Sequence, residues 1–196
     1  DLEAGVEYLR SQFRVSNAFI PTLRHDLEAT RATLAANAEW ALNTSTFLEA
    51  GTRLTYVTSR QTVYTEPRLA IRYDDPDTPI GGYSVRLAGG IYRQFTSQFD
   101  ISRDGASAVV PTASVWLPTD HSLAPPRAYH LSADGLWTPA PGWRVNVETY
   151  AKFQPHLLAI DYPALRSGIA VYGTGTPDQS RFISSSNGRA VGAGFR

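Results

Sequence analysis

The chain alternates apolar and polar residues over most of its length, which is the pattern of β-strands whose two faces meet different surroundings. In residues 32–42, Leu34 and Trp40 fall on one face, and Asn37 and Glu39 fall on the other. The same pattern predicts eight strands, at 2–13, 32–42, 47–57, 66–73, 83–94, 127–137, 143–153 and from about residue 188. Most have about 9–11 residues, which is the length that a tilted strand needs to cross a bilayer.

The connections between the predicted strands sort by length. The short ones are 43–46, 74–82 and 138–142, and the others are 14–31, 58–65, 95–126 and 154–185. An up-and-down arrangement places all the short connections at one end of the sheet, as in outer-membrane barrels. We therefore predict an all-β, antiparallel up-and-down meander of about eight strands, forming an open part of a larger transmembrane β-barrel.

Aromatic residues on the apolar faces fall into two groups that flank aliphatic positions. The predicted membrane-interface aromatics are Trp40, Tyr73, Tyr83, Trp137 and Trp143 beside the short turns, and Tyr56, Tyr129 and Phe153 near the long connections. Trp and Tyr combine an apolar body with a polar tip, which suits the headgroup boundary of a membrane. Two aromatic bands around an aliphatic band are typical of a barrel in lipid.

The opposite faces carry many charges of both signs. The predicted lumen-facing residues are Glu39, Glu49, Arg53, Arg68, Arg72, Arg86, Asp134, Arg144 and Glu148. Their number and mixed sign favour a wide lumen that is hydrated or plugged. The simpler interpretation is a sheet face that is exposed to water.

Composition narrows the possible functions. The 196 residues carry a formal net charge of zero, which offers no electrostatic reason to expect nucleic acid as a partner. Cysteine is absent, which excludes disulfide scaffolds and thiol catalysis. No apolar run reaches the length of a membrane-spanning helix. The chain has no methionine and begins at Asp1, so we expect a segment of a longer protein.

Catalytic and metal-binding motifs are missing from the sequence. The four histidines lie far apart and lack the i, i+4 spacing of a helical metal site. We therefore expect no enzymatic activity, no cofactor and no metal. The candidate ligand-binding residues are Tyr92, Arg93, Trp116 and His121, which lie in or beside the longest connection and would suit an anionic ligand. The alternative is that Trp116 packs this connection onto itself.

Several stretches resemble barrel strands of TonB-dependent outer-membrane receptors. These are EPRLAIRY at 66–73, GIYRQF at 90–95, PPRAYH at 125–130, GWRVNVETY at 142–150 and NGRAVG at 187–192. The resemblance is close over 47–196 and loose over the first 46 residues. It implies that 1–196 is part of the receptor's β-barrel domain, without the plug domain and the energy-coupling segment that such receptors carry.

The resemblance also implies a function. Such receptors lie in the bacterial outer membrane and import scarce nutrients such as iron chelates (siderophores), cobalamin or glycans. The implied partners are outer-membrane lipid, the plug domain of the same full-length chain, a periplasmic TonB-type energy-coupling protein and a small nutrient ligand.

Two other architectures fit the alternation. A soluble or secreted β-sandwich, such as a carbohydrate-binding module, would bury the apolar faces between two sheets. A complete eight-stranded barrel would pair residues 2–13 with 188–196.

Overall fold

The computed structural model describes residues 1–17, 20–101, 113–119, 124–161 and 183–196, and nearly all of them lie in β-strands. The elements are β1 (Leu2–Asn17), β2 (Ile20–Ala41), β3 (Thr46–Val57), the 3-10 turn η1 (Thr58–Arg60), β4 (Thr62–Asp75), β5 (Gly82–Arg93), β6 (Thr96–Ile101), β7 (Ala113–Pro118), β8 (Arg127–Thr138), β9 (Val145–Ile160) and β10 (Ile183–Phe195). No helix of the described residues has the length and apolar character to cross a membrane.

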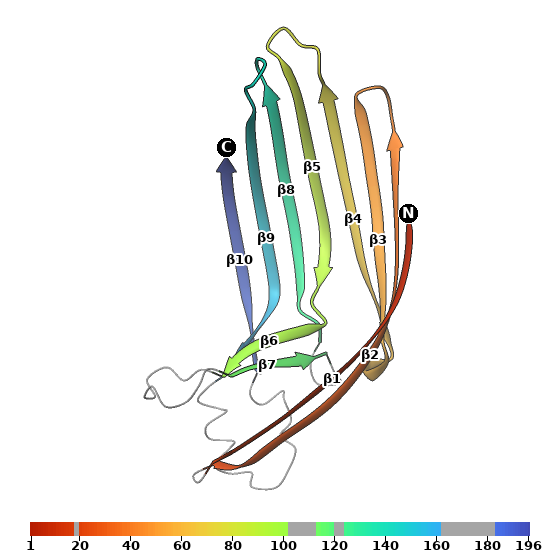
Figure 1. Ribbon diagram of the computed structural model, residues 1–196. Coiled ribbons are helices and arrows are strands. Elements are labelled where there is room, and N and C mark those ends of the chain that lie inside the picture. Colours follow the sequence, from red (N-terminus) through yellow and green to blue (C-terminus); the bar gives the residue numbers. More distant parts are fainter. Residues whose placement is uncertain (18–19, 102–112, 120–123, 162–182) are drawn as a thin grey trace.

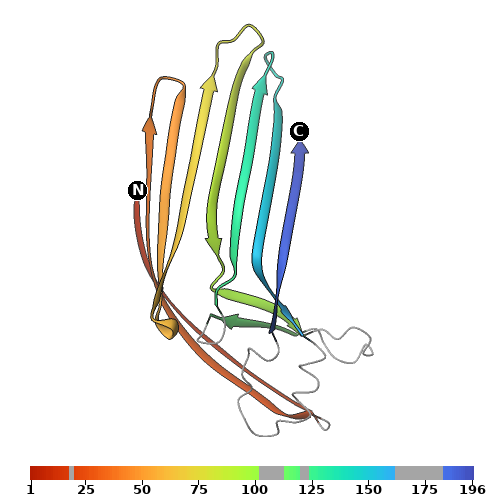
Figure 2. The ribbon, with the colours of Figure 1, turned by 180° about the vertical axis from the view of Figure 1, so that it is seen from behind.

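Eight strands form one antiparallel sheet in the order β1-β2-β3-β4-β5-β8-β9-β10 (Figure 1). The hairpin of β6 and β7 forms a separate two-stranded sheet, which crosses the end of the large sheet where β5 ends and β8 begins (Figure 2). β1 and β10 are the two edges of the large sheet and are not paired with each other. The open up-and-down meander is therefore confirmed, and the described strands do not form the closed eight-stranded alternative.

The register divides the sheet into two faces. One row of paired residues reads Glu39, Glu49, Ala70, Ala88, Ser132, Tyr150 and Gly192 across seven strands. The next row reads Ala38, Ala50, Leu69, Gly89, Leu131, Ala151 and Val191. Because successive side chains of a strand point to opposite sides, these rows belong to opposite faces. We call the first the polar face and the second the apolar face.

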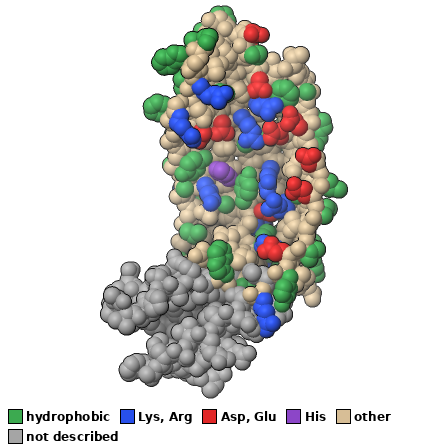
Figure 3. Space-filling model, in the orientation of Figure 1, with side chains coloured by type: hydrophobic (Ala, Val, Ile, Leu, Met, Phe, Trp, Pro, Cys, Tyr) green, Lys and Arg blue, Asp and Glu red, His purple; other side chains and the backbone are tan. Residues whose placement is uncertain are grey.

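Burial in the large sheet is the reverse of that in a water-soluble protein. Its buried side chains, within the described residues, all lie on the polar face: Ala35, Thr55, Val57, Glu66, Ala70 and Ala128. On the apolar face Leu69, Val85 and Val147 are 57%, 48% and 46% exposed. Figure 3 shows many charged side chains, of both signs, on the broad side of the sheet that this view presents. Long polar side chains thus cover the polar face, while no other layer of the described chain covers the apolar face.

The connections differ from the prediction in several places. The prediction of a connection at 14–31 is wrong. β1 and β2 pair as one continuous ladder from the Leu2–Ala36 pair to the Asn17–Ile20 pair. The consecutive polar residues at 24–26 interrupt the alternation, but backbone pairing does not need alternation. The 58–65 connection contains η1, and β4 begins at Thr62. The predicted 95–126 connection contains the β6–β7 hairpin, and β9 continues to Ile160.

The short connection between β2 and β3 is closed by one side chain. The Asn43 carboxamide oxygen accepts hydrogen bonds from the backbone N–H groups of Ser45 and Thr46, at 2.9 and 2.8 Å. Such a side chain-to-backbone turn needs only three or four residues. This predicted turn is confirmed, and it sets the register of β2 against β3.

Candidate functional site

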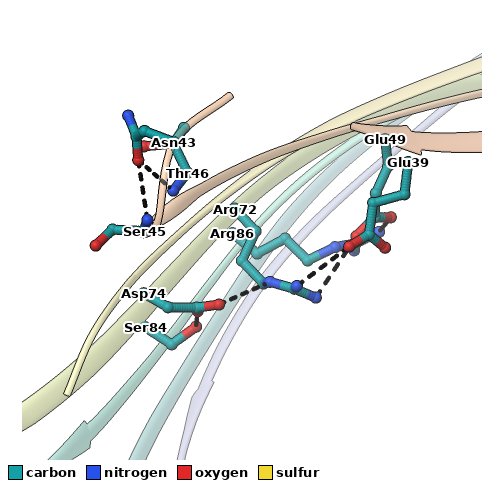
Figure 4. A network of polar contacts seen from close by, with 9 residues as sticks. All are labelled: Glu39, Asn43, Ser45, Thr46, Glu49, Arg72, Asp74, Ser84 and Arg86. Carbon is teal, nitrogen blue, oxygen red and sulfur yellow. Dashed lines mark hydrogen bonds and ion pairs between the residues drawn. The ribbon is translucent and has the colours of Figure 1, made fainter. Parts of the chain in front are cut away.

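A network of charges occupies the polar face near the short turns (Figure 4). Glu49 on β3 lies between two arginines, with Oε2 at 2.9 Å from the Arg86 guanidinium and Oε1 at 3.9 Å from that of Arg72. Arg72 also reaches Glu39 on β2 at 3.5 Å and donates from Nε to Asp74 at 3.0 Å. The network therefore ties β2, β3, β4 and β5 together.

The network resolves a repulsion that the register creates. Arg72 and Arg86 are directly opposite on β4 and β5, where like charges destabilise a strand pair. The carboxylates of Glu49 and Asp74 lie beside them and neutralise both guanidinium groups. These side chains keep about a third or more of their surface in solvent, so each pair contributes only about 0–1 kcal/mol. The network sets the charge of the face more than its stability.

A second group, the arginine–aromatic cluster, lies closer to the long connections on the same face. It consists of Arg68, Tyr92, His130, Tyr150 and Lys152. The Arg68 guanidinium carbon is 5.1 Å from the centre of the Tyr92 ring. The His130 ring lies edge-on to Tyr92 and Tyr150, with centroids at 6.0 and 6.1 Å. Lys152 is paired with His130 in the register.

Glycines shape the floor of this cluster. A Cβ added at Gly90 would lie 3.2 Å from the Tyr92 ring, and one at Gly192 would overlap the Tyr150 ring. Both tyrosine rings therefore fold down over backbone that carries no side chain, as aromatic residues do beside glycines in sheets. The Arg68 Nε–H has no hydrogen-bond partner. The cluster thus offers cationic and aromatic groups that can bind an anion.

Glu66 closes a gap between β4 and β5. The paired residues of these strands end at Arg68 and Gly90. Beyond them, the Glu66 carboxylate accepts the backbone N–H of Arg93 at 2.7 Å, and the Arg93 guanidinium lies 4.9 Å from the centre of the Tyr64 ring. Glu66 is only 2% exposed, and its other oxygen has no hydrogen-bond partner. Sequence reasoning missed this residue, and Pro67 beside it was the one local sign of an interrupted ladder.

The candidate ligand-binding residues are only partly brought together. Tyr92 belongs to the arginine–aromatic cluster, whereas the neighbouring Arg93 contacts Glu66 and Tyr64. Trp116 lies on β7 in the small sheet and is half exposed. His121 lies outside the described residues.

Most of the predicted lumen-facing residues share the polar face by register. These are Glu39, Glu49, Arg53, Arg68, Arg72, Arg86, Asp134 and Glu148. Arg144 differs, because β9 begins at Val145 and the ladder does not include Arg144. Trp143 lies in the same turn, where its backbone N–H donates to the Ala140 carbonyl at 3.0 Å.

The predicted membrane-interface aromatics that lie on strands share the apolar face, in two bands. Near the short turns, Tyr73 and Tyr83 lie 5.9 Å apart between ring centres, and Trp137 donates from Nε1 to the Ile80 carbonyl at 2.8 Å. Near the long connections, the Tyr129 and Phe153 rings are stacked at 6.3 Å. Trp40 and Tyr56 are both exposed on this face. Indole and phenol groups therefore meet solvent at both ends of an aliphatic band.

Comparison with known proteins finds no family model, curated protein or solved structure that matches this chain. Within the described residues, no group of three or more histidine, aspartate or glutamate side chains could hold a metal ion.

Proposed function

We propose that this chain forms part of the wall of a bacterial outer-membrane β-barrel, with its apolar face against lipid and its polar face toward the lumen. The observation that carries the proposal is the reversed burial of the sheet. Valine and leucine side chains are about half exposed on one face, while a glutamate and small residues are buried on the other. Water would make such an arrangement unfavourable, but hydrocarbon makes it favourable.

Strand length and the aromatic bands support the same proposal. The large sheet has strands of 12 or more residues, which exceeds the roughly 9–11 residues needed to cross a bilayer. Ring-bearing residues at both ends of the aliphatic band match the two headgroup levels of a membrane. The free edges of β1 and β10 would pair with further strands of the same barrel.

We further propose that the barrel imports a scarce nutrient, with energy delivered by a TonB-type protein. The support is the resemblance of its strands to those of TonB-dependent receptors, together with the charged polar face. In this proposal, the network around Glu49 and Arg86 faces the plug domain. The arginine–aromatic cluster, which lies nearer the long connections, contacts an anionic nutrient on its way into the lumen. No covalent chemistry is required of the chain.

The soluble β-sandwich is the competing proposal. It requires a second sheet over Leu69, Val85 and Val147, and the described residues place none there. Membrane fractionation tests the choice directly. We expect the full-length protein in the outer-membrane fraction, resistant to extraction with alkaline carbonate and soluble only with detergent. Recovery as a stable monomer from the aqueous fraction would overturn the barrel proposal.

The import proposal needs its own test. Uptake of a panel of iron chelates, cobalamin and glycans is compared in cells with and without the gene. We expect uptake of one class to be lost on deletion and to stop when the inner-membrane proton gradient is collapsed. If the protein inserts in the membrane but its deletion changes no uptake, or if uptake continues without the gradient, the import proposal is wrong. The barrel proposal would still hold.

A further inference from the structure

The apolar face carries a groove that the barrel proposal does not explain. The groove has a volume of about 970 Å³ and crosses the sheet from β3 to β10. Its lining includes small residues, among them Ala50, Gly89 and Ala151, and larger apolar ones such as Leu131 and Phe153. Arg68, His130 and Lys152, from the neighbouring polar-face rows, also contribute to the lining. The groove is shallow and open along its length, and its lining is mainly apolar. Such a surface suits a hydrocarbon chain that lies along it.

Two arginines lie on the side of the groove toward the long connections: Arg189 is part of its lining, and Arg127 is two residues from the lining residue Tyr129. The Arg127 guanidinium carbon lies 4.9 Å from the centre of the Tyr129 ring, and that of Arg189 lies 5.5 Å from the centre of the Phe153 ring. Because Tyr129 and Phe153 are stacked with their planes 13° apart, the two cations flank one aromatic pair. Phe153 and Arg189 are paired in the register, which places this array in the aromatic band near the long connections.

The charge of these arginines is not balanced within the described chain. No carboxylate there forms an ion pair with Arg127 or Arg189, and the buried Arg127 Nε–H has no hydrogen-bond acceptor. Arg127 is moreover directly opposite Arg93 in the register. Like charges in this position repel each other, so an anion that contacts them is favoured. A phosphate group suits arginine because it accepts two parallel N–H bonds.

We propose that this surface binds one molecule of an anionic, phosphate-bearing membrane lipid. The phosphate contacts Arg127 and Arg189 at the headgroup level, and an acyl chain lies in the groove over Ala50, Gly89 and Ala151. The inference rests on the proposed function, since it requires that the apolar face meets lipid. The two positive charges favour an anionic lipid. Because the arginines lie next to the apolar groove, a ligand that also carries a long acyl chain is favoured over a free anion.

The test uses purified full-length protein in uncharged detergent, with native mass spectrometry to count bound lipids. The probes are long-chain phosphatidylglycerol, phosphatidylcholine with the same acyl chains, and inorganic phosphate. We expect the wild type to prefer phosphatidylglycerol. The double variant Arg127→Gln/Arg189→Gln should lose about 25-fold in affinity, at about fivefold for each arginine. Arg144→Gln at the opposite end is the matched control and should bind like the wild type.

A second variant tests the groove separately from the charge. Ala151→Phe fills part of the floor at an exposed position, so it should weaken long-chain phosphatidylglycerol but not inorganic phosphate. Inorganic phosphate that binds as tightly as the lipid would overturn the proposal, as would a double variant that retains wild-type lipid affinity. If the protein inserts in membranes but shows no preference for phosphatidylglycerol, only the lipid site is wrong. Failure to enter membranes would instead refute the proposed function.

Discussion

An arginine at the centre of the apolar face provides the sharpest test of what covers that face. Leu87 on β5 is 48% exposed, and it lies four residues from Tyr83 in one aromatic band and four from Ile91, which is paired with Tyr129 in the other. Each band is therefore about 13 Å away along the strand, at about 3.3 Å per residue. Leu87 consequently occupies the level of the bilayer midplane in the barrel proposal.

The two possible surroundings give different magnitudes for Leu87→Arg. On the lipid face of a barrel, arginine at the midplane destabilises by about 2–4 kcal/mol. On a sheet face in water, exchange of a half-exposed side chain changes stability by about 0.5 kcal/mol or less. The difference exceeds the error of a denaturation experiment. The loss of stability comes from moving a charge into hydrocarbon and does not depend on any particular polar partner.

The assay is reversible denaturation of the full-length protein in phospholipid vesicles, followed by tryptophan fluorescence. Ile80→Arg is the matched control, because Ile80 is 66% exposed in the short connection outside the aliphatic band. We expect Ile80→Arg to stay within about 0.5 kcal/mol of the wild type. Equal free energies of unfolding for both variants would mean that water covers the apolar face, and the reasoning behind the barrel wall would be refuted.

Three further predictions concern the polar face and the turns. Glu66→Ala should lower the free energy of unfolding by about 1–3 kcal/mol, because it leaves the Arg93 N–H without its acceptor. Glu66→Gln should lower it less, and equal losses for the two variants in chemical denaturation would contradict this role of Glu66. A double-mutant cycle on Glu49 and Arg86 should give a coupling of about 0–1 kcal/mol that falls as salt rises, and a larger, salt-independent coupling would show a buried pair instead. Asn43→Ala should lower the free energy of unfolding by about 1 kcal/mol, since two backbone N–H groups lose their acceptor. Asn43→Asp keeps an acceptor oxygen and should lose much less. A wild-type denaturation midpoint for Asn43→Ala would contradict the role of this side chain in the turn.

Alternation predicted the strands well where each strand keeps one face in a uniform environment. Leu69 and Val85 share the apolar face as expected, and the short turn at Asn43 is where the sequence places it. The prediction was wrong at 14–31, where consecutive polar residues hide a continuous ladder. Backbone hydrogen bonds hold those strands together whatever their side chains are, so a side-chain pattern cannot report them.

The candidate site was only partly predictable. Tyr92 was identified from its place beside a long connection, but its partners Arg68 and His130 lie on β4 and β8. Glu66 carried no signal of burial, because a glutamate before a proline is normally a surface residue. Arg127 and Arg189 lie far apart in the chain, and only the pairing of β8 with β9 and of β9 with β10 brings them to the same aromatic pair.

The sequence by itself determined which face each strand residue occupies, because the period of two is a local property of an extended backbone. It could not determine which rows meet, since register depends on hydrogen bonds between strands that are distant in sequence. β5 pairs with β8 across the whole β6–β7 hairpin, and this pairing assembles the cluster around His130 and the groove on the opposite side. Tertiary structure alone decided these sites, because each requires side chains from three or more strands at one level of the sheet.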